Sequence, residues 1–243
     1  MWDEPLYLGS RTFSSRLIVG TEQYPSLDVM RRCHELAGAE LVVVAVRRVD
    51  PSREGESVLG RIDAGRTTLL PSTAGSFTSD EAVRTAHLAR EAGLGELVKL
   101  EVHGDQRTRF PEVQAVLEAT KSLARDGFTV LAATSDDPVV ARRLEDAGAA
   151  AVLALGAPPG SGVGIRNPHA LGVLLGGVTV PVIVHGGIGT ASDAALAMEL
   201  GCHGVVVESA IALARDPEAM AEAMKLAVQA GRFAHKAGRI PRR

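Results

Sequence analysis

The 243-residue sequence predicts an α/β fold, a (β/α)8 barrel that forms a single domain over residues 1–243. Short runs of β-branched and apolar residues alternate with longer amphipathic segments, and eight such pairs fit the length of one barrel. Glycine follows several amphipathic segments, as it often does where helices end, and Asp-Pro or Asn-Pro precedes others, as it often does where helices begin. The sequence contains no linker, low-complexity segment or shift in composition, which favours one domain.

Each expected strand is a short apolar run that ends before a polar or glycine-rich segment. The strands are Leu17–Val19, Leu41–Val46, Thr68–Leu70, Leu97–Val102, Thr129–Ala132, Ala151–Leu155, Pro181–Val184 and Gly204–Val207. The helices are Leu27–Ala37, Ser57–Ala64, Asp80–Ala92, Glu112–Arg125, Pro138–Ala147, Pro168–Gly176, Ser192–Leu200 and Pro217 to about Ala234. The second helix has the weakest signal because Arg53-Glu54-Gly55-Glu56 has the composition of a loop. A doubly wound open sheet shows the same alternation, but no GxGxxG motif follows the first strand.

Composition excludes several classes of protein. Hydrophobic residues make up 46% and charged residues 23% of the chain, and the formal net charge is −3, so neither disorder nor a basic nucleic-acid groove is expected. The longest uncharged apolar stretch, residues 170–184, is too short to span a bilayer, and the N-terminus has no apolar signal segment. Cys33 and Cys202 lie far apart in sequence, which argues against a disulfide framework. We expect a cytoplasmic protein that binds neither membrane nor nucleic acid.

The fourth strand carries the strongest chemical signal. In a barrel, catalytic groups lie at the C-terminal ends of the strands, and alternation along Leu97–Val102 directs Lys99 and Glu101 together into the interior. Desolvation favours the neutral amine of a lysine, which can then attack a carbonyl and form an imine. Glu101 beside it is suited to carry protons, although a purely structural buried ion pair is the alternative.

Glycine-rich segments follow the strands where barrels commonly bind phosphate. Exposed backbone N–H groups after the seventh and eighth strands can hold an anion, although glycine also simply permits tight turns. A third glycine-rich loop follows the sixth strand and has the length of a lid or an anion cradle. The candidate phosphate and substrate contacts in these segments are Gly160, Gly162, Gly186, Gly187, Gly189, Glu208 and Ser209.

His185 ends the seventh strand and is the third catalytic candidate, because an imidazole at a barrel mouth can exchange protons near neutral pH. Other positions expected at the mouth are Glu22, Arg47, Ser72 and Thr73. The histidines and cysteines show no spacing typical of metal ligands, so no metal site is predicted. No organic cofactor is expected either.

Several motifs together resemble the thiazole synthase family along nearly the whole chain. They are Ser14-Ser15-Arg16-Leu17 with Gly20-Thr21, Arg47-Arg48-Val49-Asp50, Leu70-Pro71 with Thr73-Ala74-Gly75, Val98-Lys99-Leu100-Glu101, Asp137-Pro138, Gly156-Ala157-Pro158 with Gly160-Ser161-Gly162, and Gly187-Ile188-Gly189. This resemblance implies a barrel enzyme that holds a ketose phosphate as an imine on Lys99, with Glu101 as the acid/base. It also implies a sulfur donor, the C-terminal thiocarboxylate of a small ubiquitin-like carrier protein, and a homo-oligomer. In true thiazole synthases, dehydroglycine then closes the ring.

Four departures from the family pattern lie at the mouth. His185-Gly186 stands where the family usually has Asp-Ala, Ser72 where it has Asn, Glu22 where it has Gly, and Ala132-Ala133 where it has Pro-Tyr. Because Lys99 and Glu101 remain, these changes favour an altered substrate over a decayed enzyme. We therefore rank a 2-thiosugar synthase acting on a hexose phosphate ahead of a genuine thiazole synthase. A Schiff-base aldolase or isomerase and a non-catalytic phosphate-binding paralogue stay open.

Overall fold

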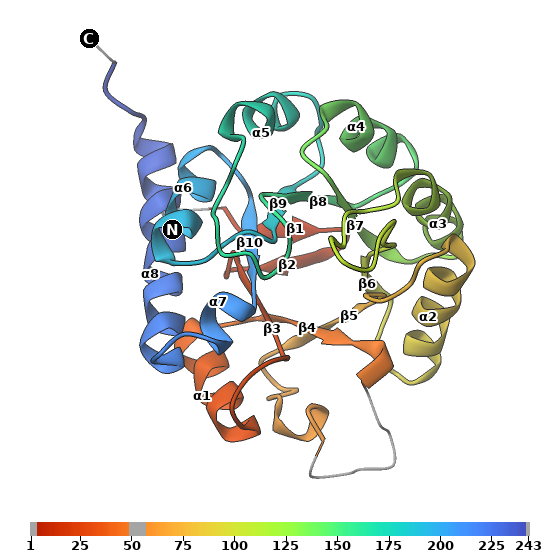
Figure 1. The fold of residues 1–243 in the computed structure, drawn as a ribbon, viewed down its shortest axis with the longest axis horizontal. Coiled ribbons are helices and arrows are strands. Elements are labelled where there is room, and N and C mark those ends of the chain that lie inside the picture. The colour runs from red at the N-terminus through yellow and green to blue at the C-terminus, as the bar shows by residue number, and fades with distance from the viewer. Residues whose placement is uncertain (1–3, 49–56, 242–243) are drawn as a thin grey trace.

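A computed structural model describes residues 4–48 and 57–241. Eight parallel strands close into a barrel, and helices surround it (Figure 1). The fold predicted from the sequence is confirmed. The barrel strands are β3 (Leu17–Gly20), β4 (Leu41–Ala45), β5 (Thr68–Ser72), β6 (Leu97–Leu100), β7 (Thr129–Thr134), β8 (Ala151–Leu155), β9 (Val182–His185) and β10 (Gly204–Val207). Each strand pairs with its neighbours in chain order, and β10 pairs with β3 to close the barrel.

The alternation of side chains along the strands produces two separate apolar layers. In β6, Val98 and Leu100 belong to the cluster that also contains helix residues, so they lie between barrel and helices. Leu97 belongs to a second cluster that contains only side chains from the barrel strands and the N-terminal hairpin, which is the barrel interior. Positions of the same parity as Leu97, namely Lys99 and Glu101, therefore face inward, as the sequence predicts.

The helices begin where the sequence signals them. They are α1 (Leu27–Ala37), α2 (Ser79–Glu91), α3 (Val113–Arg125), α4 (Pro138–Asp146), α5 (Pro168–Leu175), α6 (Ala191–Glu199), α7 (Ser209–Ala212) and α8 (Pro217–Ala237). The side chains of Asp137, Asn167 and Asp216 each accept a backbone N–H in the first turn, and a proline follows each of them. These caps satisfy N–H groups that have no partner within the helix.

The helix expected over Ser57–Ala64 is wrong. The structure has only the 3-10 turn η2 (Leu59–Arg61) there, and the 3-10 turn η1 (Val46–Arg48) follows β4. Gly60 disfavours a longer helix, and the Asp63 side chain accepts the backbone N–H of Gly65 and thereby forms a turn. The loop predicted at Arg53-Glu54-Gly55-Glu56 lies outside the described residues.

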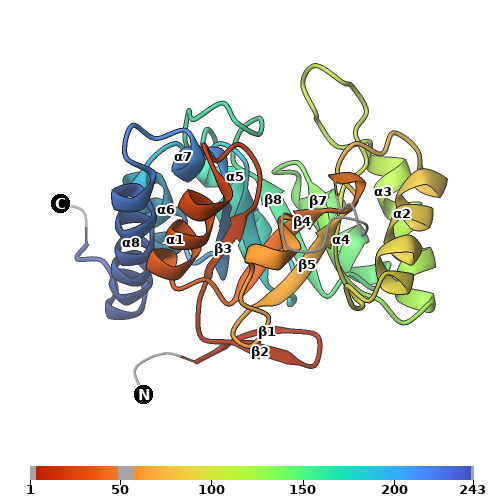
Figure 2. The same ribbon diagram turned by 90° about the horizontal axis from the view of Figure 1, so that it is seen from below.

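An N-terminal hairpin closes one end of the barrel. Strands β1 (Leu6–Leu8) and β2 (Arg11–Phe13) pair antiparallel and lie across the end of the barrel where the strands begin (Figure 2). Leu6, Leu8 and Phe13 are almost fully buried and belong to the interior cluster. The sequence analysis missed both this hairpin and α7. With the N-terminal end plugged by apolar side chains, the chemistry is left to the C-terminal end.

Candidate active site

A cavity of about 600 Å³ opens at the C-terminal ends of the barrel strands. Its walls come from the segments after β3, β5, β6, β8, β9 and β10, which are distant in sequence and meet because the strands are parallel. Most of the predicted site residues line this one space. They are Glu22, Ser72, Lys99, Glu101, Gly160, His185, Gly186, Gly187, Glu208 and Ser209.

Lys99 and Glu101 form a buried ion pair on the floor of this cavity. Lys99 is 7% and Glu101 6% exposed, and the Lys99 ammonium contacts Oε1 of Glu101. Ser72, which lies beside Lys99 in the β5–β6 register, donates its hydroxyl to the same oxygen at 3.0 Å. Burial by itself would raise the pKa of Glu101, but Lys99 and His185 outweigh it and lower the pKa to about 2. Glu101 is therefore an ionised carboxylate at neutral pH.

Thr73 holds the backbone of Glu101 without lining the cavity. Its hydroxyl donates to the Glu101 carbonyl and accepts the Glu101 N–H, both at 2.8 Å. The backbone N–H of Thr73 also donates to the Lys99 carbonyl at 3.1 Å. These bonds continue the pairing of β5 with β6 beyond the last strand residues. Thr73 thus fixes the direction of the Glu101 side chain.

His185 faces the ion pair from β9. It is 7% exposed, and burial lowers the pKa of its imidazole to about 4, with Lys99 adding to the effect and Glu101 opposing it. The ring is neutral at pH 7, so one of its nitrogens can accept a proton. The three predicted catalytic residues therefore line the same cavity.

His103 is a fourth polar residue of this cavity that the sequence analysis missed. It lies just beyond β6, lines the cavity, and is 7% exposed. Burial lowers the pKa of its imidazole, while Glu101 opposes this shift. Its ring packs edge-on against Phe77 at a centroid distance of 6.1 Å, and its backbone N–H donates to the Ser76 carbonyl. Strand alternation, which places residues 99, 101 and 103 on one face, was the signal for it.

The loop after β6 places two guanidinium groups at the cavity rim. Arg107 and Arg109 line the opening, although the sequence analysis assigned a role to neither of them. Asp105 shapes this loop because its carboxylate accepts the Thr108 backbone N–H at 2.7 Å. Arg109 has a left-handed backbone with φ of 55°, which is strained for a residue other than glycine.

Three further predicted residues lie outside the cavity. Arg47 donates a guanidinium N–H to the Gly75 carbonyl. Gly162 and Gly189 lie against each other, and a side chain on Gly189 would collide with the Gly162 carbonyl. Both glycines therefore serve loop packing.

Glu208 and Glu22 form the wall on the β3–β10 side. Oε1 of Glu208 accepts the Glu22 backbone N–H at 2.7 Å, and burial raises the pKa of the Glu208 carboxyl. The Glu22 side chain pairs with Arg48 at 3.1 Å. Of the adjacent arginines, Arg48 is thus the one that reaches a residue lining the cavity.

Gly187→Ala is expected to destabilise the fold by about 2–3 kcal/mol, because it places a side chain on a left-handed backbone and also creates a steric clash. Gly187 has φ of 82°, and an added Cβ would lie 2.7 Å from both the Ala157 N and the Gly164 O. Gly93→Ala is the matched control, since its φ is 78° and nothing lies within 4 Å of an added Cβ. That control should lose only about 1 kcal/mol in urea unfolding. Equal losses in both variants would contradict the packing argument.

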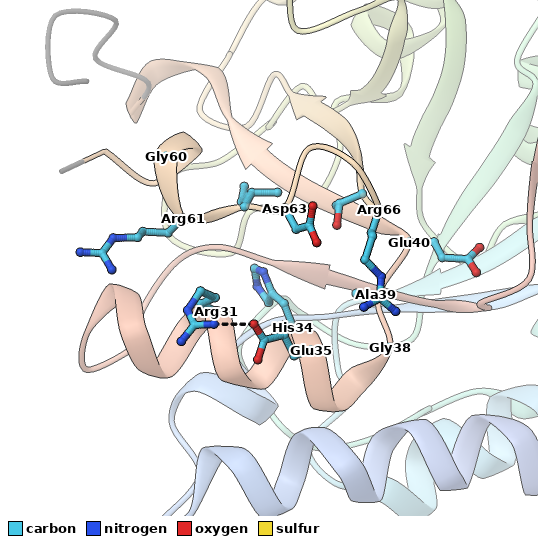
Figure 3. A pocket seen from close by; sticks show the side chains of 12 residues that line it. Arg31, His34, Glu35, Gly38, Ala39, Glu40, Gly60, Arg61, Asp63 and Arg66 are labelled. Carbon is cyan, nitrogen blue, oxygen red and sulfur yellow. Dashed lines mark hydrogen bonds and ion pairs between the residues drawn. The ribbon is translucent and has the colours of Figure 1, made fainter. Parts of the chain in front are cut away.

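A second cavity, of about 760 Å³, lies on the outside of the barrel between α1 and the segment that contains η2 (Figure 3). Its charged side chains pair locally: Arg31 contacts Glu35 at 2.6 Å, and Glu40 accepts the Ser14 N–H at 2.6 Å. None of the predicted site residues lines it. Its location and local pairing separate it from the candidate active site.

Residues 4–48 and 57–241 show neither a cluster of metal ligands nor a membrane-spanning helix. No group of three or more His, Cys, Asp or Glu side chains is arranged to hold a metal ion there. No helix in that part of the chain combines the length and the hydrophobicity that crossing a bilayer requires.

Comparison with known proteins identifies relatives along the entire chain. Residues 7–243 match the family described as thiazole biosynthesis protein ThiG. Thiazole synthases of Geotalea uraniireducens (strain Rf4) and Myxococcus xanthus (strain DK1622) are each 57% identical over 99% of this chain and 93% of the relative. The structure of the Amycolatopsis orientalis BexX/CysO complex matches with a TM-score of 0.89 and 35% identity, covering 99% of both chains. The chain belongs to the thiazole synthase family.

Proposed function

We propose that this protein is a thiazole synthase that binds a phosphorylated ketose as an imine on Lys99 and adds sulfur from a thiocarboxylated carrier protein. The observation that carries the proposal is the buried Lys99–Glu101 pair, which shares one cavity with His185 in a chain of this family. A lysine directed at a substrate-sized space and in contact with a proton acceptor is the arrangement that imine formation requires.

The first step is proton transfer followed by attack. The Lys99 ammonium gives a proton to Oε1 of Glu101, and the free Nζ attacks the ketone carbon. A C–N bond forms, and the attacking nitrogen passes one of its protons to the carbonyl oxygen, which becomes a hydroxyl. Glu101 returns its proton to this hydroxyl, the C–O bond breaks, and water leaves as the protonated C=N bond forms. The carboxylate is regenerated, so the step needs no other reactant.

The two neutral histidines are suited to the later proton transfers. Removing a proton from the carbon beside the imine requires an unprotonated base, and the His185 imidazole is neutral at pH 7 and lines the same cavity as Lys99. His103 interacts with the same carboxylate from the segment just beyond β6, so it helps to hold the charge of Glu101 in place. We assign His185 the role of base and His103 a positioning role.

The phosphate is assigned to the loops after β9 and β10. Gly186, Gly187 and Ser209 line the cavity there, and backbone N–H groups hold anions without introducing a competing charge. The ketose then extends from this wall towards Lys99. Gly160 lies near Ser209, so the loop after β8 can cover the bound phosphate.

The sulfur donor must reach the imine from solvent. The cavity opens at the end of the barrel away from the hairpin, and an extended C-terminal tail can enter it there. BexX, the structural relative described above, was solved as a complex with a second protein, CysO. That arrangement supports a protein partner for the present chain.

The relatives reverse the order of the two leading hypotheses. The departures at His185, Ser72 and Glu22 favoured a 2-thiosugar synthase, but the relatives that are 57% identical carry the name thiazole synthase. We therefore place thiazole formation first. Thiosugar formation from a hexose phosphate is the second candidate, because an imidazole replaces the usual carboxylate at His185.

The deciding experiment supplies the protein with a thiocarboxylated carrier and one of two sugars, a deoxyxylulose phosphate or glucose 6-phosphate. Each reaction is run with and without dehydroglycine, and products are identified by mass spectrometry. The proposal predicts thiazole phosphate only from the deoxyxylulose phosphate with dehydroglycine. A thiosugar formed from glucose 6-phosphate would show that the protein is a thiosugar synthase, the second candidate. Turnover without the carrier would indicate an aldolase or isomerase, and binding without any adduct would indicate a non-catalytic paralogue.

The stability of the protein is expected to fall between pH 6.5 and pH 4 because His185 is buried neutral. The unfolded imidazole binds a proton below about pH 6.5, whereas the folded one does so only near pH 4, so the unfolded state binds more protons in this window. The difference between these two pKa values corresponds to on the order of 3 kcal/mol in the free energy of unfolding. Urea unfolding of the wild type and of His185→Asn at pH 7 and pH 4 measures this loss of stability. The variant should lose less stability on acidification, and exposed His169→Asn should behave as wild type. Identical losses in all three proteins would refute the assignment.

A further inference from the structure

Glu208 is an ionisable residue of the cavity that the mechanism above does not use. In β10, Val205 and Val207 belong to the outer apolar cluster, whereas Val206 packs against the interior one. Alternation therefore directs Glu208, which has the parity of Val206, into the barrel, and it lines the cavity. Three strands separate β10 from β6 in either direction around the barrel (Figure 1). Glu208 thus faces the substrate space from the side opposite Lys99.

The carboxyl group of Glu208 is packed against the backbone of β3. Val206 pairs with Ile18 in the β10–β3 register, which places Glu208 beside Gly20. A Cβ added to Gly20 would lie 2.6 Å from both Cδ and Oε1 of Glu208. Oε1 also accepts the backbone N–H of Glu22 at 2.7 Å. One carboxyl oxygen is therefore bonded to the wall, and within the part of the chain that the structure describes no hydrogen bond engages the other.

Glu208 is also distinguished by the lack of a cation beside it. Three glutamates line the cavity, and two of them pair with a basic side chain. Glu101 pairs with Lys99, and Glu22 pairs with Arg48. Among the described residues, Glu208 forms no such pair. A charge that is desolvated and uncompensated is unfavourable, so the neutral acid is the form that this position favours.

The ionisable groups around Glu208 support the neutral form. Burial raises the pKa of its carboxyl group, and the charges of Glu22 and Glu101 add to this, while the Glu22 N–H and Lys99 oppose it without outweighing it. The other ionisable side chains that interact with it or line the same cavity are Tyr24, His103, Arg107, Arg109 and His185. Glu101, by contrast, has a lowered pKa. Two carboxyl groups of one cavity whose pKa values are shifted in opposite directions are suited to act as an acid and a base.

We propose that Glu208 is the general acid for sulfur addition, and that it gives its proton to the oxygen of the carbon that the thiocarboxylate attacks. This inference rests on the proposed function. Isomerisation of the imine moves a hydrogen from the neighbouring hydroxyl-bearing carbon to the imine carbon, with His185 as the base, and leaves a ketone beside an amine linkage to Lys99.

The proton of Glu208 is used when sulfur adds to this ketone. A C–S bond forms, the electron pair of the C=O double bond moves to the oxygen, and the oxygen takes the Glu208 proton to become a hydroxyl. Glu208 becomes a carboxylate and regains a proton from water at the cavity opening. The thiocarboxylate loses its negative charge in the new bond, so atoms and charge balance without a further reactant.

The neutral acid is also compatible with the phosphate assigned to the loops after β9 and β10. Ser209, one of the assigned contacts, follows Glu208 directly in the chain. An ionised Glu208 would repel a phosphate at this distance, whereas a protonated one would not. Binding of the phosphorylated sugar therefore favours the protonated form further, and the acid is in place when the sulfur donor arrives.

Glu208→Gln keeps an oxygen that accepts the Glu22 N–H but removes the proton. Transfer of sulfur to the sugar should fall by about 10²-fold or more, while the borohydride adduct on Lys99 still forms, because Glu101 serves that earlier step. Glu118→Gln, at an exposed position on α3, is the matched control and should transfer sulfur at the wild-type rate.

The outcomes of this substitution are distinguishable. The amide of Glu208→Gln can still donate a hydrogen bond, so wild-type sulfur transfer by the variant would show that Glu208 only binds substrate and would overturn the proposal. Circular dichroism checks that the variant is folded. Failure of the wild type to form either the adduct or the sulfur product would instead refute the proposed function.

Protonation of Glu208 is measured without any reaction by infrared spectroscopy. In the wild type minus Glu208→Gln difference spectrum, the band of a protonated carboxyl should titrate with a midpoint above the ordinary glutamate pKa of about 4.3. Glu22→Gln should move this midpoint to lower pH, because a neighbouring negative charge is lost. Sulfur transfer by the wild type should slow as the pH rises through the same midpoint. A midpoint at or below the ordinary value would overturn the proposal.

Discussion

Replacement of Lys99 by arginine is expected to abolish the borohydride-stable adduct with the ketose phosphate and to remove turnover completely. Arginine keeps the positive charge opposite Glu101 but has no amine that can form an imine at neutral pH. Arginine is chosen because it keeps this charge: removing one member of a buried ion pair costs about 3–5 kcal/mol of stability and could unfold the protein. Wild type should gain the mass of one dehydrated and reduced sugar phosphate, and peptide mapping should place it on Lys99.

The controls separate chemistry from folding. Lys121→Arg replaces an exposed lysine on α3 and should retain the full adduct, since only three lysines besides Lys99 occur in the chain. Lys99→Ala should also give no adduct, and circular dichroism reports whether either variant at position 99 is folded. An adduct of wild-type yield in a folded Lys99→Arg protein would refute the imine assignment.

The barrel and the position of its catalytic pair were predictable because they depend on local patterns. Period-two alternation in β6 sends Lys99 inward whatever the rest of the chain does, and the parallel connection of strands brings their C-terminal ends together. The helix caps at Asp137 and Asp216 are equally local, since each side chain bonds within its own first turn. These predictions therefore needed no knowledge of distant contacts.

Other features depend on contacts between distant segments and could not be predicted. The hairpin strands have three residues each, and they are stable because Leu8 and Phe13 fill the end of a barrel formed by later segments. Thr73 was expected at the mouth, but its hydroxyl is satisfied by the Glu101 backbone on a neighbouring strand. Arg47 likewise binds the Gly75 carbonyl. Pairing of this kind follows from the register between strands, which the sequence does not specify residue by residue.

The role of the glycines in the loops after β8 and β9 could not be predicted for a different reason. Glycine suits both anion binding and close packing, so sequence alone could not separate the two roles. Gly189 is required for contact with Gly162, whereas Gly186 and Gly187 line the cavity and also have positive φ. The same residues can thus be necessary for the turn and available to a phosphate.

Glu101→Gln is expected to slow imine formation by about 10²-fold or more, because the amide cannot accept the proton that the Lys99 ammonium must lose. The substitution keeps the size of the side chain, and the amide oxygen can still accept the Ser72 hydroxyl, which donates to Oε1 in the wild type. A stopped single-turnover reaction with borohydride measures the rate of adduct formation directly. Glu91→Gln, at an exposed position on α2, is the matched control and should react at the wild-type rate.

The pH dependence distinguishes a proton acceptor from a counter-ion. In the wild type the proton passes within the pair, and the lowered pKa of Glu101 keeps its carboxylate ionised across the neutral range, so the rate should change little with pH there. In Glu101→Gln the proton must leave to solvent, so the rate should rise with pH across the neutral range. A variant that is slow but has a flat profile would show that Glu101 only holds Lys99 in place. A variant with the wild-type rate would remove Glu101 from the mechanism, and the proton would then have to go to His185, the base that faces the ion pair from β9.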